Sequence, residues 1–307
     1  MSSPTGPASG LPVRMPRPRQ SGRHRRPEPA AAPEGAPALV LAVPGVPSAA
    51  IRSLAEEVVS IARSELPGLD ALIGFVEGDA SEYPSLATVL TAAATLRTER
   101  YELAVAAGRE VSAPAGPASV VVPLLAGPDS AQTRQVRQAV MDAGNTAELT
   151  DVLGPHPLLA EALHVRLSEA GLARADRARL FTVATAADGI ILATVGGEEA
   201  VQAAGITGML LAARLAVPVI AAALDQEGSI ASVAEQLRGS GSEQLALAPY
   251  LIGPELADGL LDEASKEAGC AAAEPLGAYP AIGKLVLSQY TTALGIPPQQ
   301  PQGAPSL

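Results

Sequence analysis

The 307-residue sequence contains one cysteine, no tryptophan and only 2% aromatic residues. The single cysteine, Cys270, excludes a disulfide within the chain and any metal or redox site that needs several thiolates. It stands in Gly-Cys-Ala-Ala-Ala, and we expect it to be a packing residue at the start of a buried strand. Because aromatic rings are so scarce, the core must be built from Ala, Val, Leu and Ile. Such side chains suit Ala-rich helices on both faces of a parallel sheet.

Long apolar runs are also missing. Gly, Pro or charged residues interrupt every run before it reaches the roughly 20 residues that a membrane-spanning helix needs. The arginines near the amino terminus are not followed by the apolar segment of a secretory signal. These absences predict a cytoplasmic protein without a membrane partner.

Basic residues are scarce outside the first 37 positions. The chain carries 21 Lys and Arg against 32 Asp and Glu, a net charge of −11. Six arginines lie in Arg14–Arg26, and the same 37 positions hold only two acidic residues, so the remainder has 15 basic and 30 acidic residues. An acidic body repels nucleic acid, and we expect no nucleic-acid partner for it. For the Arg-rich arm, contact with RNA, anionic lipid or an acidic partner stays open beside a tail with no specific role.

The two ends of the sequence lack the pattern of folded structure. Residues 1–37 are rich in Pro, Ser, Gly, Ala and Arg without apolar periodicity, which predicts a disordered tail. Residues 296–307 are rich in Pro and Gln and are predicted to form a second tail.

The first apolar run, Ala38–Val43, ends at Pro44 and Gly45 and is typical of a buried strand that enters a loop. Ser48 can cap the helix that follows, because apolar residues recur there at helical spacing. Strand, loop and helix in this order begin a βαβ unit. Ligands of open parallel sheets bind beyond the carboxyl ends of the strands, so Pro44 and Gly45 are candidate site residues.

The same order of elements then repeats. Leu153-Gly-Pro-His-Pro157 is echoed by Leu276-Gly-Ala-Tyr-Pro280, in which Leu, Gly and Pro recur 123 positions later. Further strands are predicted at residues 70–76, 119–125, 190–196, 217–223 and 245–253. The body is therefore predicted to be an α/β protein of two similar lobes, residues 38–172 and 185–295. Each lobe is a small parallel sheet flanked by helices, and a cleft lies between the lobes.

The loop after the strand at 119–125 supplies further candidate site residues: Gly127, Asp129, Ser130 and Ala131. Asp129 and Ser130 stand where a helix begins. A helix cap is therefore one role for them, and weak ligation of a metal through oxygen is the alternative.

Gly196 and Gly197 are the last candidate site residues, at the start of the second lobe's first helix. Two glycines would let a ligand approach the free backbone N–H groups there. A tight strand-to-helix turn explains the same pair without a ligand.

Three motifs occur in a fixed order: Pro123-Leu-Leu-Ala-Gly127, Leu153–Pro157 and Pro275-Leu-Gly-Ala-Tyr-Pro280. This set resembles the sirohydrochlorin and cobalt chelatases, the class II chelatases, over nearly all of residues 38–295. The resemblance implies a two-lobed fold that inserts Co²⁺, Fe²⁺ or Ni²⁺ into a tetrapyrrole held between the lobes.

The resemblance also implies two metal-binding histidines, one after the first strand and one after the Pro-Leu-Leu strand. Pro44 and Ala131 stand at those positions, and neither side chain can bind a metal or carry a proton. Of the three histidines present, His24 lies in the tail. His156 is replaced by Tyr279 in the repeat, which indicates a role in helix entry, and His164 is expected at the surface or at a lobe contact. We therefore assign no metal ligand and no catalytic residue.

These observations favour a chelatase-like protein with a degenerate metal site, which keeps its cleft for a tetrapyrrole or another small molecule. One alternative is an active chelatase that inserts Co²⁺ or Fe²⁺ into a sirohydrochlorin-type tetrapyrrole with non-standard ligands. The other is a non-catalytic interaction protein that acts through its Arg-rich arm.

Overall fold

The computed structural model describes residues 31–33, 35–79, 81–144, 147–173, 186–253, 256–257 and 259–296. In the first half, strands and helices alternate as β1 (Ala38–Val43), α1 (Ala49–Glu65), β2 (Ala71–Phe75), α2 (Leu86–Ala106), β3 (Ser119–Pro123), α3 (Ser130–Asp142), β4 (Ala147–Leu149) and α4 (Pro157–Glu169). The second half repeats the order with β5 (Gly189–Thr194), α5 (Gly197–Leu215), β6 (Val219–Ala223), α6 (Ser229–Gly239), β7 (Leu245–Pro249), α7 (Leu260–Ala268), β8 (Ala271–Ala272) and α8 (Pro280–Ala293).

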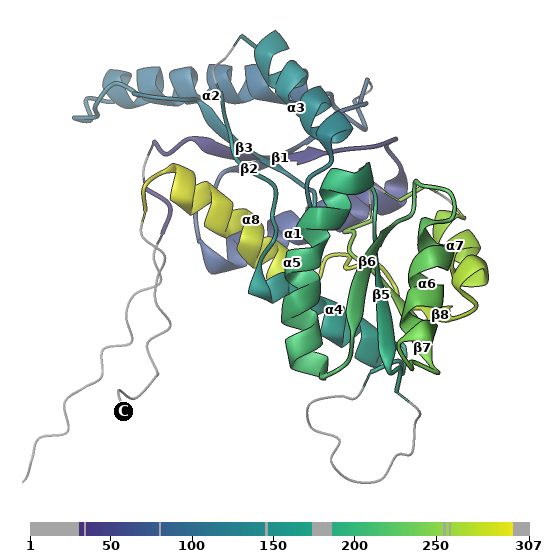
Figure 1. Ribbon diagram of the computed structural model, residues 1–307. Helices are drawn as coiled ribbons and strands as arrows, with labels where there is room; N and C mark the ends of the chain where they lie inside the picture. Colours follow the sequence, from purple (N-terminus) through teal and green to yellow (C-terminus); the bar gives the residue numbers. More distant parts are fainter. Residues whose placement is uncertain are drawn as a thin grey trace, which may run out of the picture.

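The strands form two parallel sheets of four, in the orders β2-β1-β3-β4 and β6-β5-β7-β8 (Figure 1). The central strands match in register: Ala42 of β1 pairs with Pro123, and Ala193 of β5 pairs with Pro249. The prediction of two similar α/β lobes is confirmed, with both prolines at the last residue of a central strand.

The last helix of each half packs on the opposite lobe. α8 lies against α1 and β3 of the first sheet, whereas α4 lies against α5 and β7 of the second. Both helices begin with the proline of the repeated motif, Pro157 or Pro280. The preceding loops differ, because the Gly154–Pro155 peptide is cis while Gly277 has a φ of 61°. The two halves are thus joined by exchanged helices.

One continuous apolar core runs through the junction of the lobes. It contains inward-facing residues of β1, β3, β5 and β7 together with residues of α1, α4, α5 and α8. The outer face of each sheet has its own smaller cluster, under α2 and α3 in the first lobe and under α6 and α7 in the second. The junction of the lobes is therefore filled with apolar side chains where the two sheets face each other.

The ordered body begins before the predicted boundary at residue 38. Ala32 packs against the main core, and its N–H donates to the Pro67 carbonyl at 3.0 Å. The Tyr290 hydroxyl donates to the Pro37 carbonyl at 2.7 Å, and burial is the main cause that raises its pKa to about 12. The predicted tails otherwise fall on residues 1–30 and 297–307, which lie outside the described residues. The other lobe boundaries remain a prediction.

Cys270 stands just before β8 and is half-buried, and this burial raises the pKa of its thiol. The strand that it precedes is a short edge strand, with Ala271 exposed, and not the buried strand that was predicted. Within the described ranges, no helix has the length and apolar character needed to cross a bilayer.

Candidate functional site

Two of the predicted site loops meet where the lobes join. An ideal Cβ on Gly196 would lie 3.1 Å from the Pro128 carbonyl oxygen and 3.2 Å from Asp129 Cα. Gly196 also has a φ of 113°, which disfavours any side chain. The loop after β3 and the loop after β5 are therefore packed against each other, as expected for the carboxyl ends of both sheets, but the contact leaves no space for a ligand between them.

Asp129 is the N-cap of α3. Its Oδ1 accepts hydrogen bonds from the N–H groups of Ala131 at 2.9 Å and Gln132 at 3.0 Å, and the residue is only 8% exposed. Ser130 and Ala131 form the exposed first turn of this helix. The structure thus favours helix capping over metal ligation for Asp129.

The Gly196 N–H donates to Oδ2 of Asp225 at 3.0 Å. Asp225 follows β6, so a carboxylate of the chain itself stands at the amino terminus of α5, where an anionic ligand would bind. Gly197 is the first residue of α5 and has a φ of 69°. These features support the interpretation of the glycine pair as a tight strand-to-helix turn.

Pro44 and Gly45 form the turn between β1 and α1. Pro44 is buried and Gly45 is half-buried with a φ of 77°. Ser48 caps α1 as predicted, since its hydroxyl accepts from the Ile51 N–H at 3.3 Å. On the opposite lobe, Gly253 approaches α1, and an ideal Cβ there would lie 3.2 Å from Leu54 Cδ1. The helix that follows the β1 loop is therefore part of the lobe contact.

Tyr250 fills the space beneath the β3 loop. This side chain from the end of β7 is 1% exposed, and its hydroxyl donates to the Ala126 carbonyl at 3.0 Å and bonds to Thr207 of α5 at 3.2 Å. An ideal Cβ on Gly127 would lie 3.0 Å from its ring, and one on Gly154 would collide with its hydroxyl. Gly127 is thus required for packing across the lobes.

His156 and His164 have structural partners. His156 is the N-cap of α4, with its Nδ1 accepting from the Leu158 N–H at 3.1 Å, and burial lowers the pKa of its imidazole. This confirms its predicted role in helix entry. His164 is 4% exposed, and its Nδ1 accepts from Arg214 Nε of α5 at 2.8 Å. It is a lobe-contact residue, and the alternative of a surface residue was wrong because α4 is covered by α5.

A pocket of about 570 Å³ lies beside the two loops. We call it the junction pocket, and it is lined by Pro123, Pro128, Thr133, Arg137, Val140, Met141, Ala147, Leu149, Thr150, Asp151, Val152, Gly154, Pro155 and Ala203. All but Ala203 of α5 come from the first lobe. Its volume is in the range of small-molecule sites. None of the predicted site residues lines it, although Pro128 lies between two of them, Gly127 and Asp129, so its lining was missed by the sequence analysis.

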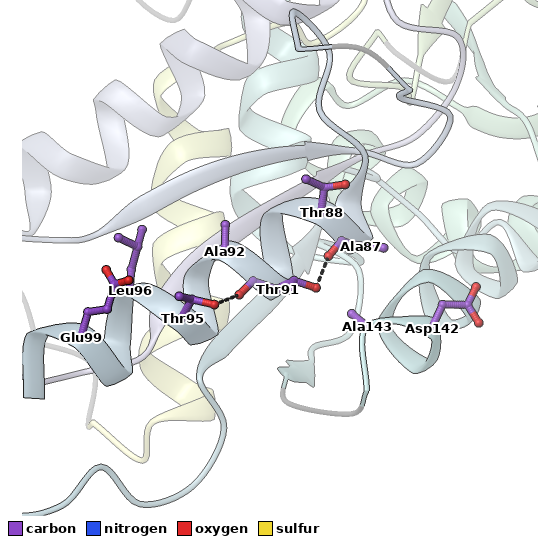
Figure 2. Close-up of a pocket in the computed structure, with 9 residues that line it drawn as sticks. All are labelled: Ala87, Thr88, Thr91, Ala92, Thr95, Leu96, Glu99, Asp142 and Ala143. Atoms are coloured by element: carbon purple, nitrogen blue, oxygen red, sulfur yellow. Dashed lines mark hydrogen bonds between the residues drawn. The ribbon is translucent and has the colours of Figure 1, made fainter. Parts of the chain in front are cut away.

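A second hollow, of about 700 Å³, lies on the outer surface between α2 and the end of α3. Figure 2 shows its threonines along α2. The Thr91 hydroxyl donates to the Ala87 carbonyl at 3.0 Å, and the Thr95 hydroxyl donates to the Thr91 carbonyl at 3.1 Å. Because these hydroxyls are turned back onto their own helix and the hollow shares no residue with the predicted loops, we do not assign the site there.

In the described part of the chain, no group of three or more His, Cys, Asp or Glu side chains is arranged to hold a metal ion. Oδ1 of Asp129 already accepts hydrogen bonds from two backbone N–H groups. What the site offers is a largely apolar pocket with a few polar groups, which suits the binding of an organic molecule.

The fold is similar to those of solved chelatase structures. SirB from Bacillus subtilis with Fe³⁺ matches 85% of this chain and 98% of its own, with a TM-score of 0.58 and 15% identity. The sirohydrochlorin chelatase SirB from Bacillus subtilis subspecies spizizenii in complex with cobalt matches 85% and 97%, with a TM-score of 0.54 and 14% identity.

DR2241 from Deinococcus radiodurans, a multi-domain protein with structural similarity to chelatases, matches 83% of this chain and 55% of its own, with a TM-score of 0.50 and 16% identity. No protein-family model and no curated protein matches the sequence. The comparisons confirm a class II chelatase-like fold, and at this identity they establish the fold alone.

Proposed function

We propose that this protein is a chelatase-like binding protein with a degenerate metal site, and that it holds a tetrapyrrole or a similar small molecule at the junction of its lobes. The observation that carries the proposal is the junction pocket, which extends from the carboxyl end of β3 along β4 and α3 and is bordered by Ala203 of α5 in the other lobe. The expectation of a cytoplasmic location is part of the same proposal.

The vacated ligand positions support a loss of metal chemistry. Pro44 is buried in the β1 turn, and Ala131 lies in the first turn of α3. Neither side chain has a lone pair to offer a metal. The SirB structures were described with Fe³⁺ and with cobalt, so Co²⁺ and Fe²⁺ are the metals to test here.

The decisive experiment is a titration of the purified protein with sirohydrochlorin, followed in the visible spectrum with and without Co²⁺. We expect a spectral change on binding and a rate of cobalt insertion no faster than the spontaneous reaction. Robust insertion by the unmodified protein that survives Asp129→Ala would support the alternative of an active chelatase with non-standard ligands. No spectral change would contradict the proposal.

Restoration of the imidazoles gives a second test. The double change Pro44→His and Ala131→His should raise the affinity for Co²⁺, because neutral imidazole is a good ligand for this ion. Pro44→Ala with Ala131→Gln is the matched control, since it frees the same backbone without adding imidazoles. Equal cobalt affinity of the two double variants would show that the two positions do not face a common site.

The remaining alternative, an interaction protein, depends on Arg14–Arg26, which lies outside the described residues. Binding that is carried by the isolated arm and is absent from the body would favour it.

A further inference from the structure

The junction pocket is lined by side chains of both charges. Arg137 and Thr133 line it from α3, one helical turn apart, and Asp151 lines it from the segment after β4. Within the described residues, Arg137 makes no ion pair or hydrogen bond through its side chain, either with Asp151 or with any other group. The guanidinium is therefore available to a ligand.

This arginine brings a positive charge into the pocket of an acidic body. Beyond residue 37 the chain has twice as many acidic as basic residues, so the body as a whole repels anions. Arg52, Arg100 and Arg166 are paired with Glu56, Asp70 and Glu169. Among the described residues Arg134 also has no side-chain partner, but it lies outside the pocket. An arginine without a partner in a pocket marks a local preference for an anion that the overall charge does not predict.

The rest of the pocket is suited to an apolar body. Val140, Met141, Leu149 and Pro155 contribute hydrocarbon surface from the first lobe, and Ala203 contributes it from the second. Burial of apolar surface here provides affinity without direction. The guanidinium provides the direction, because its planar fork matches the two oxygens of a carboxylate. The carboxylate of Asp151 repels a bound anion, which favours placement of the anion beside Arg137.

We propose that the junction pocket binds an organic carboxylate with an apolar body, and that Arg137 pairs with the carboxylate while Thr133 donates to it. This inference rests on the proposed function, because a tetrapyrrole with carboxylate side chains is one member of the class. It goes further by naming the anchoring residue and the orientation of the ligand.

The test uses 2-naphthoate as the probe and the full chain as the protein. The chain has no tryptophan, so the fluorescence of the naphthalene ring can be followed directly. Arg137→Gln should weaken naphthoate binding about five- to ten-fold, as expected for the loss of a charge-assisted hydrogen bond at a solvent-accessible site. Arg134→Gln is the matched control: it removes the same charge from the same helix at a residue outside the pocket, and it should leave the affinity within about two-fold.

Two further measurements separate charge from shape. The neutral analogue 2-naphthamide should bind the natural protein and Arg137→Gln equally, whereas Asp151→Asn should strengthen naphthoate binding. Equal naphthoate affinities of Arg137→Gln and Arg134→Gln would overturn the inference, and so would an absence of naphthoate binding to the natural protein.

Failure of the inference and failure of the proposed function give different results. Sirohydrochlorin binding that is insensitive to Arg137→Gln, without naphthoate binding, would leave the proposed function standing and overturn the role of Arg137. Naphthoate binding that depends on Arg137, without sirohydrochlorin binding, would support the anion pocket and reject the tetrapyrrole as its ligand.

Discussion

Arg166 and Gln289, which stand 123 positions apart, make the same contact between the halves in opposite directions. Arg166 of α4 donates to the Leu276 carbonyl through Nε at 3.3 Å and Nη2 at 2.9 Å. Gln289 of α8 donates to the Val152 carbonyl at 3.0 Å. The Leu276 carbonyl lies in the loop before α8, and the Val152 carbonyl lies in the loop before α4. The internal repeat therefore includes tertiary contacts as well as secondary structure.

We expect both contacts to stabilise the junction. Arg166→Met keeps the aliphatic stem and should lower the free energy of unfolding by about 1–3 kcal/mol, and Gln289→Met should lower it by about 0.5–1.5 kcal/mol, since neutral hydrogen bonds contribute less than charged ones. Urea denaturation measures both. Glu169→Gln is the control, because it removes only the exposed partner of Arg166 and should change stability by less than about 1 kcal/mol. Equal effects of all three changes would contradict a stabilising role for the hydrogen bonds of Arg166 and Gln289 between the halves.

Two helical glycines should respond to alanine with opposite signs. An ideal Cβ on Gly283 of α8 would lie 2.5 Å from Ile61 Cγ2 and 3.1 Å from the Val58 carbonyl oxygen of α1, whereas one on Gly205 of α5 meets no atom within 4 Å. Gly283→Ala should therefore destabilise the protein by about 1–3 kcal/mol through overpacking. Gly205→Ala should stabilise it by roughly 0.4–1 kcal/mol, because alanine is the better helix former. Thermal unfolding of the two variants compares them, and a stable Gly283→Ala protein would mean that α1 and α8 separate easily.

Removal of one oxygen should weaken the junction beneath the β3 loop. Tyr250→Phe leaves the Ala126 carbonyl and the Thr207 hydroxyl without their bonds to the phenol. We expect a loss of about 1–3 kcal/mol in the free energy of unfolding, because buried polar groups are costly to leave without partners. Tyr101→Phe, on a half-exposed part of α2, is the control and should change the free energy of unfolding by less than about 0.5 kcal/mol. If Tyr250→Phe left the free energy of unfolding unchanged, water or another group would have to replace the hydroxyl.

Part of the acid sensitivity should come from His156. Burial lowers the pKa of this imidazole below its ordinary value, so the unfolded chain takes up a proton before the folded protein does. Stability that is present above about pH 6.5 should then be lost as the pH falls through the folded pKa. His156→Asn keeps an N-cap without a titrating group. Between pH 7 and 5.5, the denaturation midpoint of His156→Asn should fall less than that of the natural protein. Equal falls would show that His156 does not contribute to the loss of stability at acid pH.

The fold could be predicted because its central strands are unbroken apolar runs that end in recognisable turns. Ala38–Val43 and Gly189–Thr194 are buried at every residue, and burial on both faces leaves few alternatives to a central parallel strand. β4 was missed because its three residues lie at the sheet edge, where Glu148 is exposed. The exchange of α4 and α8 could not be predicted, since an apolar helix face indicates burial but not the surface that buries it.

The candidate site was less accessible to sequence reasoning. Asp129 and Ser48 could be assigned as caps because that role is local. Arg137 could not be found, since an exposed arginine on a polar helix has the pattern of a solvated face. The folded arrangement of α3 beside β4 and Ala203 of α5 makes that face a pocket wall. His164 is likewise buried where α4 meets α5, whose Arg214 lies 50 positions away in the sequence.

The exchanged helices also set the order in which the protein can be completed during synthesis. The central strands of the first sheet are complete once Pro123 has been synthesised. The helix α8, which covers one face of this sheet, is formed by residues 280–293 and is synthesised much later. At about 5–20 residues per second, the ribosome needs roughly ten to thirty seconds to bridge that interval. For this time the nascent first lobe carries an apolar face that no other part of the emerged chain covers in the native way, which is the kind of surface that chaperones bind.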